Sequence, residues 1–197
     1  MRFQNAIDTY LQNCKATIDR LDRAAIDTVA GLILDAYHDK RQIFVFGNGG
    51  SASTASHFAC DLNKGACQHA RNRFKVICLN DNLPTLMAYA NDVSYADIFS
   101  EQLKNFVQPG DLVIGFSGSG NSPNVLNAID YANQQNAITI GITGYDGGKL
   151  ARSARHAVNA NVNDMQLSED VHIILVHLLM RTLMEAIAAA ECPGEAL

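Results

Sequence analysis

The stretch Gln42–Ala52 reads QIFVFGNGGSA, and it indicates the fold class of the whole chain. A run of β-branched and aromatic residues ends in glycines, and a helical pattern follows at once, to about Asn63. Three glycines let the backbone turn sharply and approach a ligand closely. Unpaired N–H groups at the start of the next helix suit a phosphate. The stretch therefore predicts a buried strand, a ligand-binding turn and a helix.

The same alternation of strand and helix continues along the chain. Further strands are expected at 74–79, 112–116, 137–143 and 156–159, and further helices at 82–90, 95–107, 123–134, 149–153 and 168–190. Strands separated by single helices form βαβ units, and continuously apolar strands are typical of a parallel sheet that is covered on both faces. Right-handed crossovers then give a three-layer, doubly wound α/β fold of the flavodoxin-like or Rossmann-like kind. Its binding site is expected at the carboxyl ends of the strands.

The N-terminal segment differs from the rest. Residues 3–36 carry apolar side chains at helical spacing, which predicts one long helix or two helices bent near Asp22. This segment precedes the first strand and has little sheet to cover, so we expect it to pack on another subunit. A length of 197 residues fits one domain, with a helical arm at 1–38 and an α/β core at 39–197.

The composition argues against several classes of protein. Fifteen Lys and Arg against 20 Asp and Glu give a net charge of −5 without any basic block, so no nucleic-acid partner is expected. The longest apolar stretch, Val171–Met180, is shorter than the ~20 residues of a membrane span, and no secretory signal is evident. Five scattered cysteines without CxxC spacing fit free thiols in a reducing cytoplasm. We therefore expect a cytoplasmic protein without a membrane partner.

A second loop, Phe116–Pro123, reads FSGSGNSP and also joins a strand to a helix. Its last serine and its proline suit the first positions of a helix, but Ser117 and Ser119 have no such explanation. Hydroxyls and backbone N–H groups together can hold a phosphate without a lysine. The first loop also matches the loose dinucleotide pattern G-x-G-x-x-A, with Asp81 as the acidic partner. That nicotinamide interpretation leaves the second loop without a role, whereas a phosphorylated small molecule uses both loops.

Carboxylate–histidine pairs occur on two predicted helices. His57 and Asp61 are four residues apart and share a helix face, as a metal pair or an acid/base pair would. Glu169 and His172 share a face of the last helix, and His177 follows Glu169 by about 12 Å along an ideal helix axis. Glu169 and His177 meet only if both side chains lean inward, the helix starts late, or subunits pool residues. Each histidine alone would more often be a satisfied core residue.

Together these segments resemble the sugar isomerase (SIS) domain of bacterial phosphoheptose isomerases, nearly along the whole chain. The residues that carry the resemblance are Gly47–Ala52, His57–Ala59, Asn91–Asp92, Gly115–Ser122, Thr143–Gly148 and the closing helix with His177. The resemblance implies an aldose–ketose isomerase that converts sedoheptulose 7-phosphate to D-glycero-D-manno-heptose 7-phosphate through an enediol. Such a product leads to activated heptose for lipopolysaccharide or another surface polysaccharide. The resemblance also implies bound zinc and a homotetramer with active sites between subunits.

The resemblance further implies roles for single residues. Asp61 would be the catalytic base and His177 its acid partner, and the metal ligands would be His57, Asp61, Glu169 and His177. Substrate and phosphate contacts are implied at Asn48, Gly49, Gly50, Ser51, Asn91, Asp92, Ser117, Gly118, Ser119, Ser122 and Glu169. Two positions depart from the family, because Asp61 replaces a glutamate and Glu169 replaces a glutamine. An isomerase for a related sugar phosphate is therefore an alternative.

A function of another class stays open at this point. A replication-initiation regulator of bacteria resembles this chain in fold and in much of the two loops, yet it binds the initiator protein and catalyses no known reaction. That regulator lacks a histidine that matches His177. The joint presence of His57, Asp61 and His177 therefore favours an enzyme. A nicotinamide-binding protein ranks third.

Overall fold

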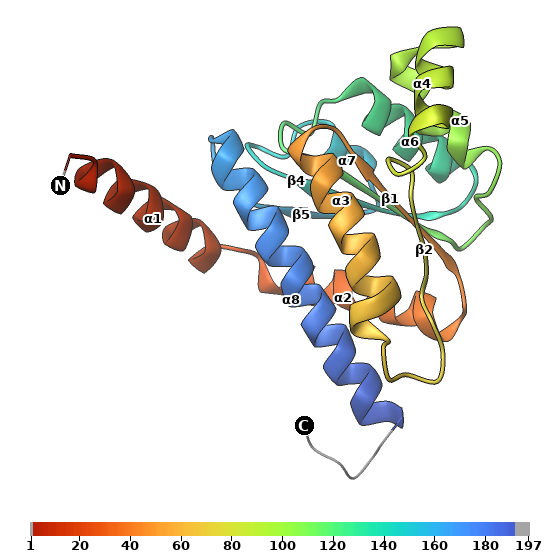
Figure 1. Ribbon diagram of the computed structural model, residues 1–197, viewed down its shortest axis with the longest axis horizontal. Helices are drawn as coiled ribbons and strands as arrows, with labels where there is room; N and C mark the ends of the chain where they lie inside the picture. The colour runs from red at the N-terminus through yellow and green to blue at the C-terminus, as the bar shows by residue number, and fades with distance from the viewer. Residues whose placement is uncertain (1, 192–197) are drawn as a thin grey trace.

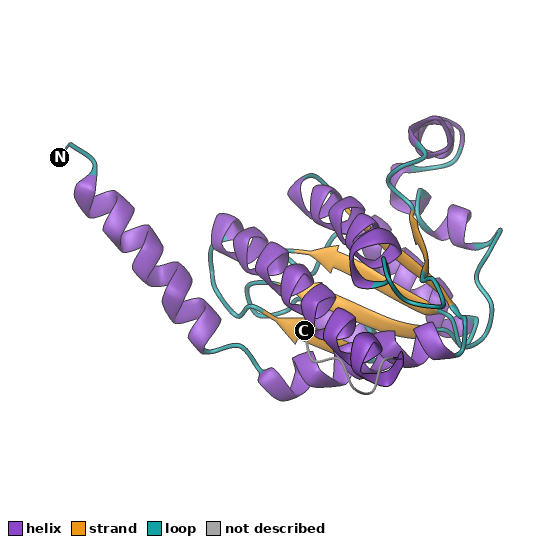
Figure 2. Ribbon diagram, turned by 60° about the horizontal axis from the view of Figure 1, so that its bottom comes forward, coloured by secondary structure: helices purple, strands orange, loops and turns teal. Residues whose placement is uncertain are grey.

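The structure, a computed structural model, describes residues 2–191 and shows a parallel sheet between two layers of helices (Figures 1 and 2). The strands are β1 (Gln42–Gly47), β2 (Lys75–Cys78), β3 (Leu112–Ser117), β4 (Ile138–Thr143) and β5 (His156–Asn159). All are parallel and lie in the order β2-β1-β3-β4-β5, which confirms the doubly wound α/β prediction. This order places the topological switch between β1 and β3, where the two glycine-rich loops leave the sheet.

Helices cover both faces of the sheet. They are α1 (Gln4–Asp19), α2 (Arg23–His38), α3 (Gly50–Cys60), η1 (Asp61–Ala66), α4 (Leu83–Asp92), η2 (Tyr95–Asp97), α5 (Ser100–Leu103), α6 (Pro123–Gln134), α7 (Leu150–Ser153) and α8 (Met165–Glu191). One apolar core joins α2, α3 and α8 to the sheet, and the other joins α5, α6 and α7 to it. In β1, Ile43 and Val45 belong to the first core, whereas Phe44 and Phe46 belong to the second. The strand is continuously apolar because both of its faces are buried.

The N-terminal segment consists of two helices, with the break at the expected place. Asp22 caps α2, because its Oδ1 accepts hydrogen bonds from the backbone N–H groups of Ala24 and Ala25. The helix before it, α1, projects from the body of the molecule (Figure 1). Its Ile7 and Leu11 are 51% and 61% exposed, so α1 carries an uncovered apolar stripe.

Three expected helices have different bounds. The pattern at 95–107 corresponds to the short η2 and the four-residue α5, and the helix expected to end at Asn63 changes to the π-helix η1 after Cys60. The last helix, α8, begins at Met165 rather than at residue 168. Cys14, Cys60, Cys67 and Cys78 are free thiols, as expected, and Cys192 lies outside the described residues.

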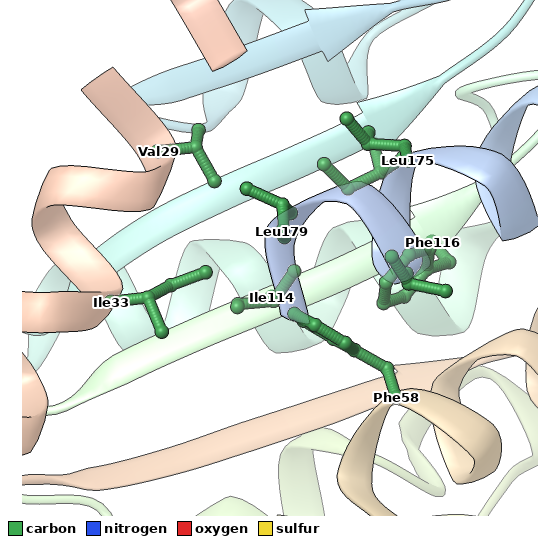
Figure 3. Close-up of a pocket in the computed structure, with 9 residues that line it drawn as sticks. Val29, Ile33, Phe58, Ile114, Phe116, Leu175 and Leu179 are labelled. Atoms are coloured by element: carbon green, nitrogen blue, oxygen red, sulfur yellow. The ribbon is translucent and has the colours of Figure 1, made fainter. Parts of the chain in front are cut away.

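Helix α8 is longer than the apolar stretch within it. By length and composition alone, its 27 residues are long and apolar enough to cross a membrane. The shorter stretch Val171–Met180 did not predict a helix of this length. One face of α8 nevertheless packs on the sheet (Figure 3). Leu175 and Leu179 meet Val29, Phe58 and other apolar side chains there, and the gap between them has no room for a water molecule. This packing fixes the position of α8 against α2 and α3.

His172 lies in the same core and is 1% exposed, with its ring edge-on to Phe116. Neither ring nitrogen has a hydrogen-bond partner in the described part of the chain. Burial lowers the pKa of His172, and the nearby backbone of Thr143 opposes this shift only in part. His172, which shares a helix face with Glu169, is therefore a neutral core residue.

We expect His172 to make folding depend on pH. Its pKa in the folded protein lies below the unfolded value of about 6.5, so protonation favours the unfolded chain. As far as His172 is concerned, the free energy of unfolding is therefore highest above about pH 6.5 and decreases as the pH falls below that value. His172→Leu should remove this acid sensitivity and cost little at pH 8, because it also removes two unpartnered nitrogens. Urea unfolding from pH 8 to pH 5.5 measures the difference, and parallel wild-type and variant curves would contradict it.

Candidate active site

Helices α3 and α8 bring two histidines and a carboxylate together. His57 on α3 and His177 on α8 face each other, with their Nε2 atoms 2.8 Å apart. Asp61, one turn after His57, places its Oδ2 3.3 Å from Nε2 of His57 and 3.9 Å from Nε2 of His177. Three of the four predicted metal ligands therefore form one cluster.

The geometry of this cluster fits a metal ion. Ligand atoms about 2.0–2.1 Å from a tetrahedral zinc ion lie about 3.4 Å apart, and the distances of 2.8, 3.3 and 3.9 Å bracket that value. Only one proton fits between the two Nε2 atoms when both imidazoles are neutral, so at least one of these nitrogens keeps a lone pair that can bind a cation. Asp61 Oδ2 is buried and has no hydrogen-bond partner among the described residues, which is costly without a cation. Histidine nitrogen and carboxylate oxygen both suit zinc.

The cluster is also open to a substrate. The side chains of His57 and His177 are 46% and 52% exposed, whereas that of Asp61 is 16% exposed. The carboxylate thus lies at the bottom of the cluster and the two rings form its accessible side. Three protein ligands with an accessible side are typical of a catalytic rather than a structural zinc site.

Glu169 is the predicted ligand that lies apart from the cluster. A Cβ atom added to Gly50 would lie 2.5 Å from Cδ of Glu169, so the carboxylate occupies the space beside the backbone at the start of α3. Gly50 with Glu169 and His57 with His177 are therefore two successive contacts between α3 and α8. The physical reason is the eight-residue separation on α8, since this helix starts early, at Met165, and keeps Glu169 and His177 more than two turns apart.

The turn that carries Asp61 is a π-helix, which the sequence pattern did not indicate. Helix α3 ends at Cys60 and continues directly as η1, with Asp61 as its first residue. Such turns are rare and occur often at functional sites, because the wider turn changes the direction of the side chains around it. Leu62 and Ala66 are buried and hold η1 in the core, and Gly65 lies beside Met180 of α8.

The two glycine-rich loops lie against each other at the switch between β1 and β3. A Cβ atom on Gly47 would lie 2.9 Å from the carbonyl oxygen of Phe116, so only glycine fits where the loops meet. In the second loop, Ser117 Oγ lies 3.2 Å from Ser122 Oγ, and Ser119 Oγ accepts a hydrogen bond from the backbone of Asn121. Ser122 precedes α6 but makes no capping hydrogen bond with its side chain. The second loop therefore gathers three hydroxyls at the start of α6.

Other predicted site residues take different places. Gly49, Gly50 and Ser51 form the start of α3, with Ser51 only 4% exposed, and Gly118 lies against Met165 of α8. Asn91 and Asp92 end α4, which has no buried residue, and Asn91 Nδ2 donates to Asp92 Oδ1 at 2.7 Å. Neither has a hydrogen bond to a glycine-rich loop within residues 2–191. Asp81, the acid of the nicotinamide interpretation, accepts a hydrogen bond from Ser56 at 2.8 Å.

Asn48 has two partners that the sequence pattern did not indicate. Its side chain is hydrogen-bonded to Asn124 at the start of α6 and to Tyr95 in η2. Position 124 directly follows the serine loop, so proximity to that loop was the available signal. Tyr95 gives no such signal, because it lies 47 residues from Asn48 and carries no motif of its own.

Comparisons with known proteins agree on one family. A model of the SIS domain matches residues 9–144. Phosphoheptose isomerase of Aquifex aeolicus is 36% identical over 159 residues, which cover 81% of this chain and 83% of that protein. Phosphoheptose isomerase of Citrifermentans bemidjiense is 35% identical over 155 residues, which cover 79% and 80%. The structure of phosphoheptose isomerase GmhA from Neisseria gonorrhoeae matches with a TM-score of 0.85 at 26% identity, covering 92% of this chain and 98% of that chain.

We expect the His57–Asp61–His177 cluster to bind zinc. Removing a residue that only holds a metal ligand in place lowers metal affinity about 10–100-fold. His57→Ala and His177→Ala remove ligands themselves, so each should lower zinc affinity at least that much. His69→Ala is the matched control, because His69 is exposed and lies outside the cluster. Competition with a fluorescent zinc chelator measures the affinities. Equal zinc affinity of the wild type and His177→Ala would contradict this site.

Proposed function

Because the chain belongs to the SIS-domain family of phosphoheptose isomerases, we propose that it converts sedoheptulose 7-phosphate to D-glycero-D-manno-heptose 7-phosphate. Family membership makes the chain a phosphosugar isomerase, and the seven-carbon substrate and the residue roles are the proposal. The observation that carries it is the His57–Asp61–His177 cluster, which α3 and η1 form with α8 along the helix that starts in the first glycine-rich loop.

The serine loop would hold the phosphate. Ser117, Ser119 and Ser122 gather at the start of α6, where unpaired N–H groups and the helix dipole favour an anion. The start of α3 is less suitable, because the Glu169 carboxylate lies there already and like charges repel each other. Binding of a phosphate several carbons from the reacting end positions the carbonyl group for reaction.

The reaction moves one proton from C1 to C2 and one from O1 to O2, through an enediol. Asp61 Oδ2 faces the two histidines, which leaves Oδ1 to take the proton from C1 and return it to C2. His177, whose side chain is half exposed, would transfer the proton between the two oxygens through Nδ1, because its Nε2 faces the cluster. The open side of the cluster gives the sugar access to both groups.

His57, Asp61 and His177 would hold the zinc ion, and Glu169 would be a fourth ligand after its side chain turns away from Gly50. When bound, the metal would polarise the sugar carbonyl and stabilise the negative charge that develops on it. The free thiols of the described residues are consistent with action in a reducing cytoplasm.

Direct assay of the reaction tests the proposal. Protein with zinc is incubated with sedoheptulose 7-phosphate, and the aldose product is observed by NMR. Unphosphorylated sedoheptulose should react poorly, because the serine loop then has no anion to hold. Absence of an aldose product from the seven-carbon substrate would reject it as the substrate, and turnover of another sugar phosphate would identify the alternative isomerase.

The role of Asp61 generates a prediction about activity. Asp61→Ala should lower kcat by about 10²–10⁴, the usual contribution of a general base, and leave the fold intact. Asp61→Glu should keep or raise activity, because the longer side chain brings a carboxylate closer to the sugar. Steady-state kinetics with circular dichroism as the folding control measures both. Activity that survives Asp61→Ala would remove Asp61 as the base, and an inactive Asp61→Glu would favour a different sugar phosphate.

We also infer a homotetramer with shared active sites. Apolar side chains are exposed on α1 and α4, and Leu83 and Met87 of α4 are 58% and 60% exposed. Monomeric proteins rarely leave such patches uncovered. A groove of about 370 Å³ between α1, α2 and α8 is lined by Ile18, Leu21, Arg23, Ile26, Asp27, Ala30, Leu178 and Thr182. Asn91 and Asp92, at the end of the exposed α4, would then reach the site of a neighbouring subunit.

The assembly can be tested through α1. Sedimentation equilibrium at micromolar concentration should give about four times the chain mass of 21.3 kDa. Leu11→Asp should shift the distribution to smaller species, because it puts a charge into the apolar stripe. Gln12→Glu adds a charge on the same helix outside that stripe and should leave the mass unchanged. A wild type that sediments only as a monomer would contradict both the assembly and the shared site.

A further inference from the structure

A chain of side-chain hydrogen bonds joins three segments beside the carboxyl ends of the strands. Asn48 Nδ2 donates to Asn124 Oδ1 at 2.8 Å, and Asn124 Nδ2 donates to Asn48 Oδ1 at 2.9 Å. Tyr95 Oη donates to the same Asn48 Oδ1 at 3.0 Å. This clamp, formed by Asn48, Asn124 and Tyr95, connects the first loop to the start of α6 and to η2, which follows α4.

One backbone group determines the orientation of the whole clamp. The N–H of Val125 can only donate, and it donates to Asn124 Oδ1 at 2.9 Å. The amide nitrogen of Asn124 must then face Asn48, whose oxygen accepts from it. Because this oxygen is an acceptor, the Tyr95 hydroxyl is the donor. Asn48 Oδ1 therefore accepts two hydrogen bonds, while one N–H of its amide has no partner in residues 2–191.

We propose that Tyr95 is a positioning residue that acts through Asn48 and makes Asn48 a hydrogen-bond donor toward the substrate. The proposal rests on the proposed function, which places the phosphate of the sugar at the start of α6, where Asn124 lies. Since both lone pairs of Oδ1 are occupied, the side chain of Asn48 offers only an N–H group. That group suits an oxygen that can only accept, namely a carbonyl oxygen or a phosphate oxygen.

The Tyr95 hydroxyl is not needed to hold η2 in place. Asn127 Nδ2 donates to the backbone oxygen of Ala96 and to Asp97 Oδ1, both at 3.0 Å, and so anchors η2 to α6 independently. Tyr95 is also 59% exposed, so removing its hydroxyl leaves no cavity. Asn124, in contrast, is 1% exposed, and its replacement would disturb the start of α6. Tyr95→Phe therefore tests the clamp with little effect on folding.

A double-mutant cycle tests whether Tyr95 acts through Asn48. Tyr95→Phe should lower kcat/KM for sedoheptulose 7-phosphate by about threefold to tenfold, as expected for one neutral hydrogen bond. In the Asn48→Ala background the same substitution should change nothing, because its route of action is already lost. Tyr131→Phe is the matched control on α6, since its hydroxyl makes no hydrogen bond in the described structure, and it should be silent in both backgrounds. Equal effects of Tyr95→Phe in both backgrounds would overturn the proposal.

A second measurement does not depend on turnover. The side-chain amide signals of Asn48 are followed by ¹⁵N–¹H NMR in the substrate-free protein, with Asn48→Ala to assign them. Tyr95→Phe should shift these signals and speed their hydrogen exchange, whereas Tyr131→Phe should not. Unchanged Asn48 signals in Tyr95→Phe would overturn the proposal. A wild type without isomerase activity would reject the proposed function, and the amide signals would still decide whether Tyr95 positions Asn48.

Discussion

The contact between α3 and α8 is the constraint on which the candidate site depends. The helices lie side by side on one face of the sheet, with Gly50 against Glu169 and His57 against His177 (Figure 1). These contacts are seven residues apart on α3 and eight on α8, so the helices run in the same direction and nearly in step. Gly50 permits the close approach at one end, and the apolar packing under α8 holds the spacing. The histidine nitrogens meet because this whole interface is fixed.

The sheet makes a second, separate contribution. Its strand order brings the loops after β1 and β3 together, and Gly47 lets them touch. Hydroxyls and amides gather at these strand ends, whereas the candidate metal ligands lie on α3, η1 and α8. In the proposed function, recognition of the phosphate and chemistry at the carbonyl would thus belong to different parts of the fold. The first loop joins them, because it both meets the serine loop and starts α3.

Strands and loops were predictable from the sequence because burial on both faces produces continuous apolar runs, and β5 has the predicted bounds 156–159. The π-helix was not, since its residues DLNKGA carry no pattern that separates a π turn from an α turn. The place of Glu169 depends on how α3 meets α8, which no local spacing encodes. Around Tyr95, helical spacing is misleading, because Ser94 caps a short turn through its contact with the backbone of Ala96.

The arm α1 has a consequence for how the enzyme responds to dilution. Within one chain it is tied to α8 by a 2.6 Å hydrogen bond from Tyr10 to Asp170, which raises the pKa of Tyr10 to about 12. Most of the stability of a helix such as α1 comes from the packing of its apolar face rather than from the helix itself. In the proposed tetramer, folding of α1 and its burial by another chain would therefore be one equilibrium. Asp170 is next to Glu169, so protein concentration would act on the site as an effector does, through an interface instead of a pocket.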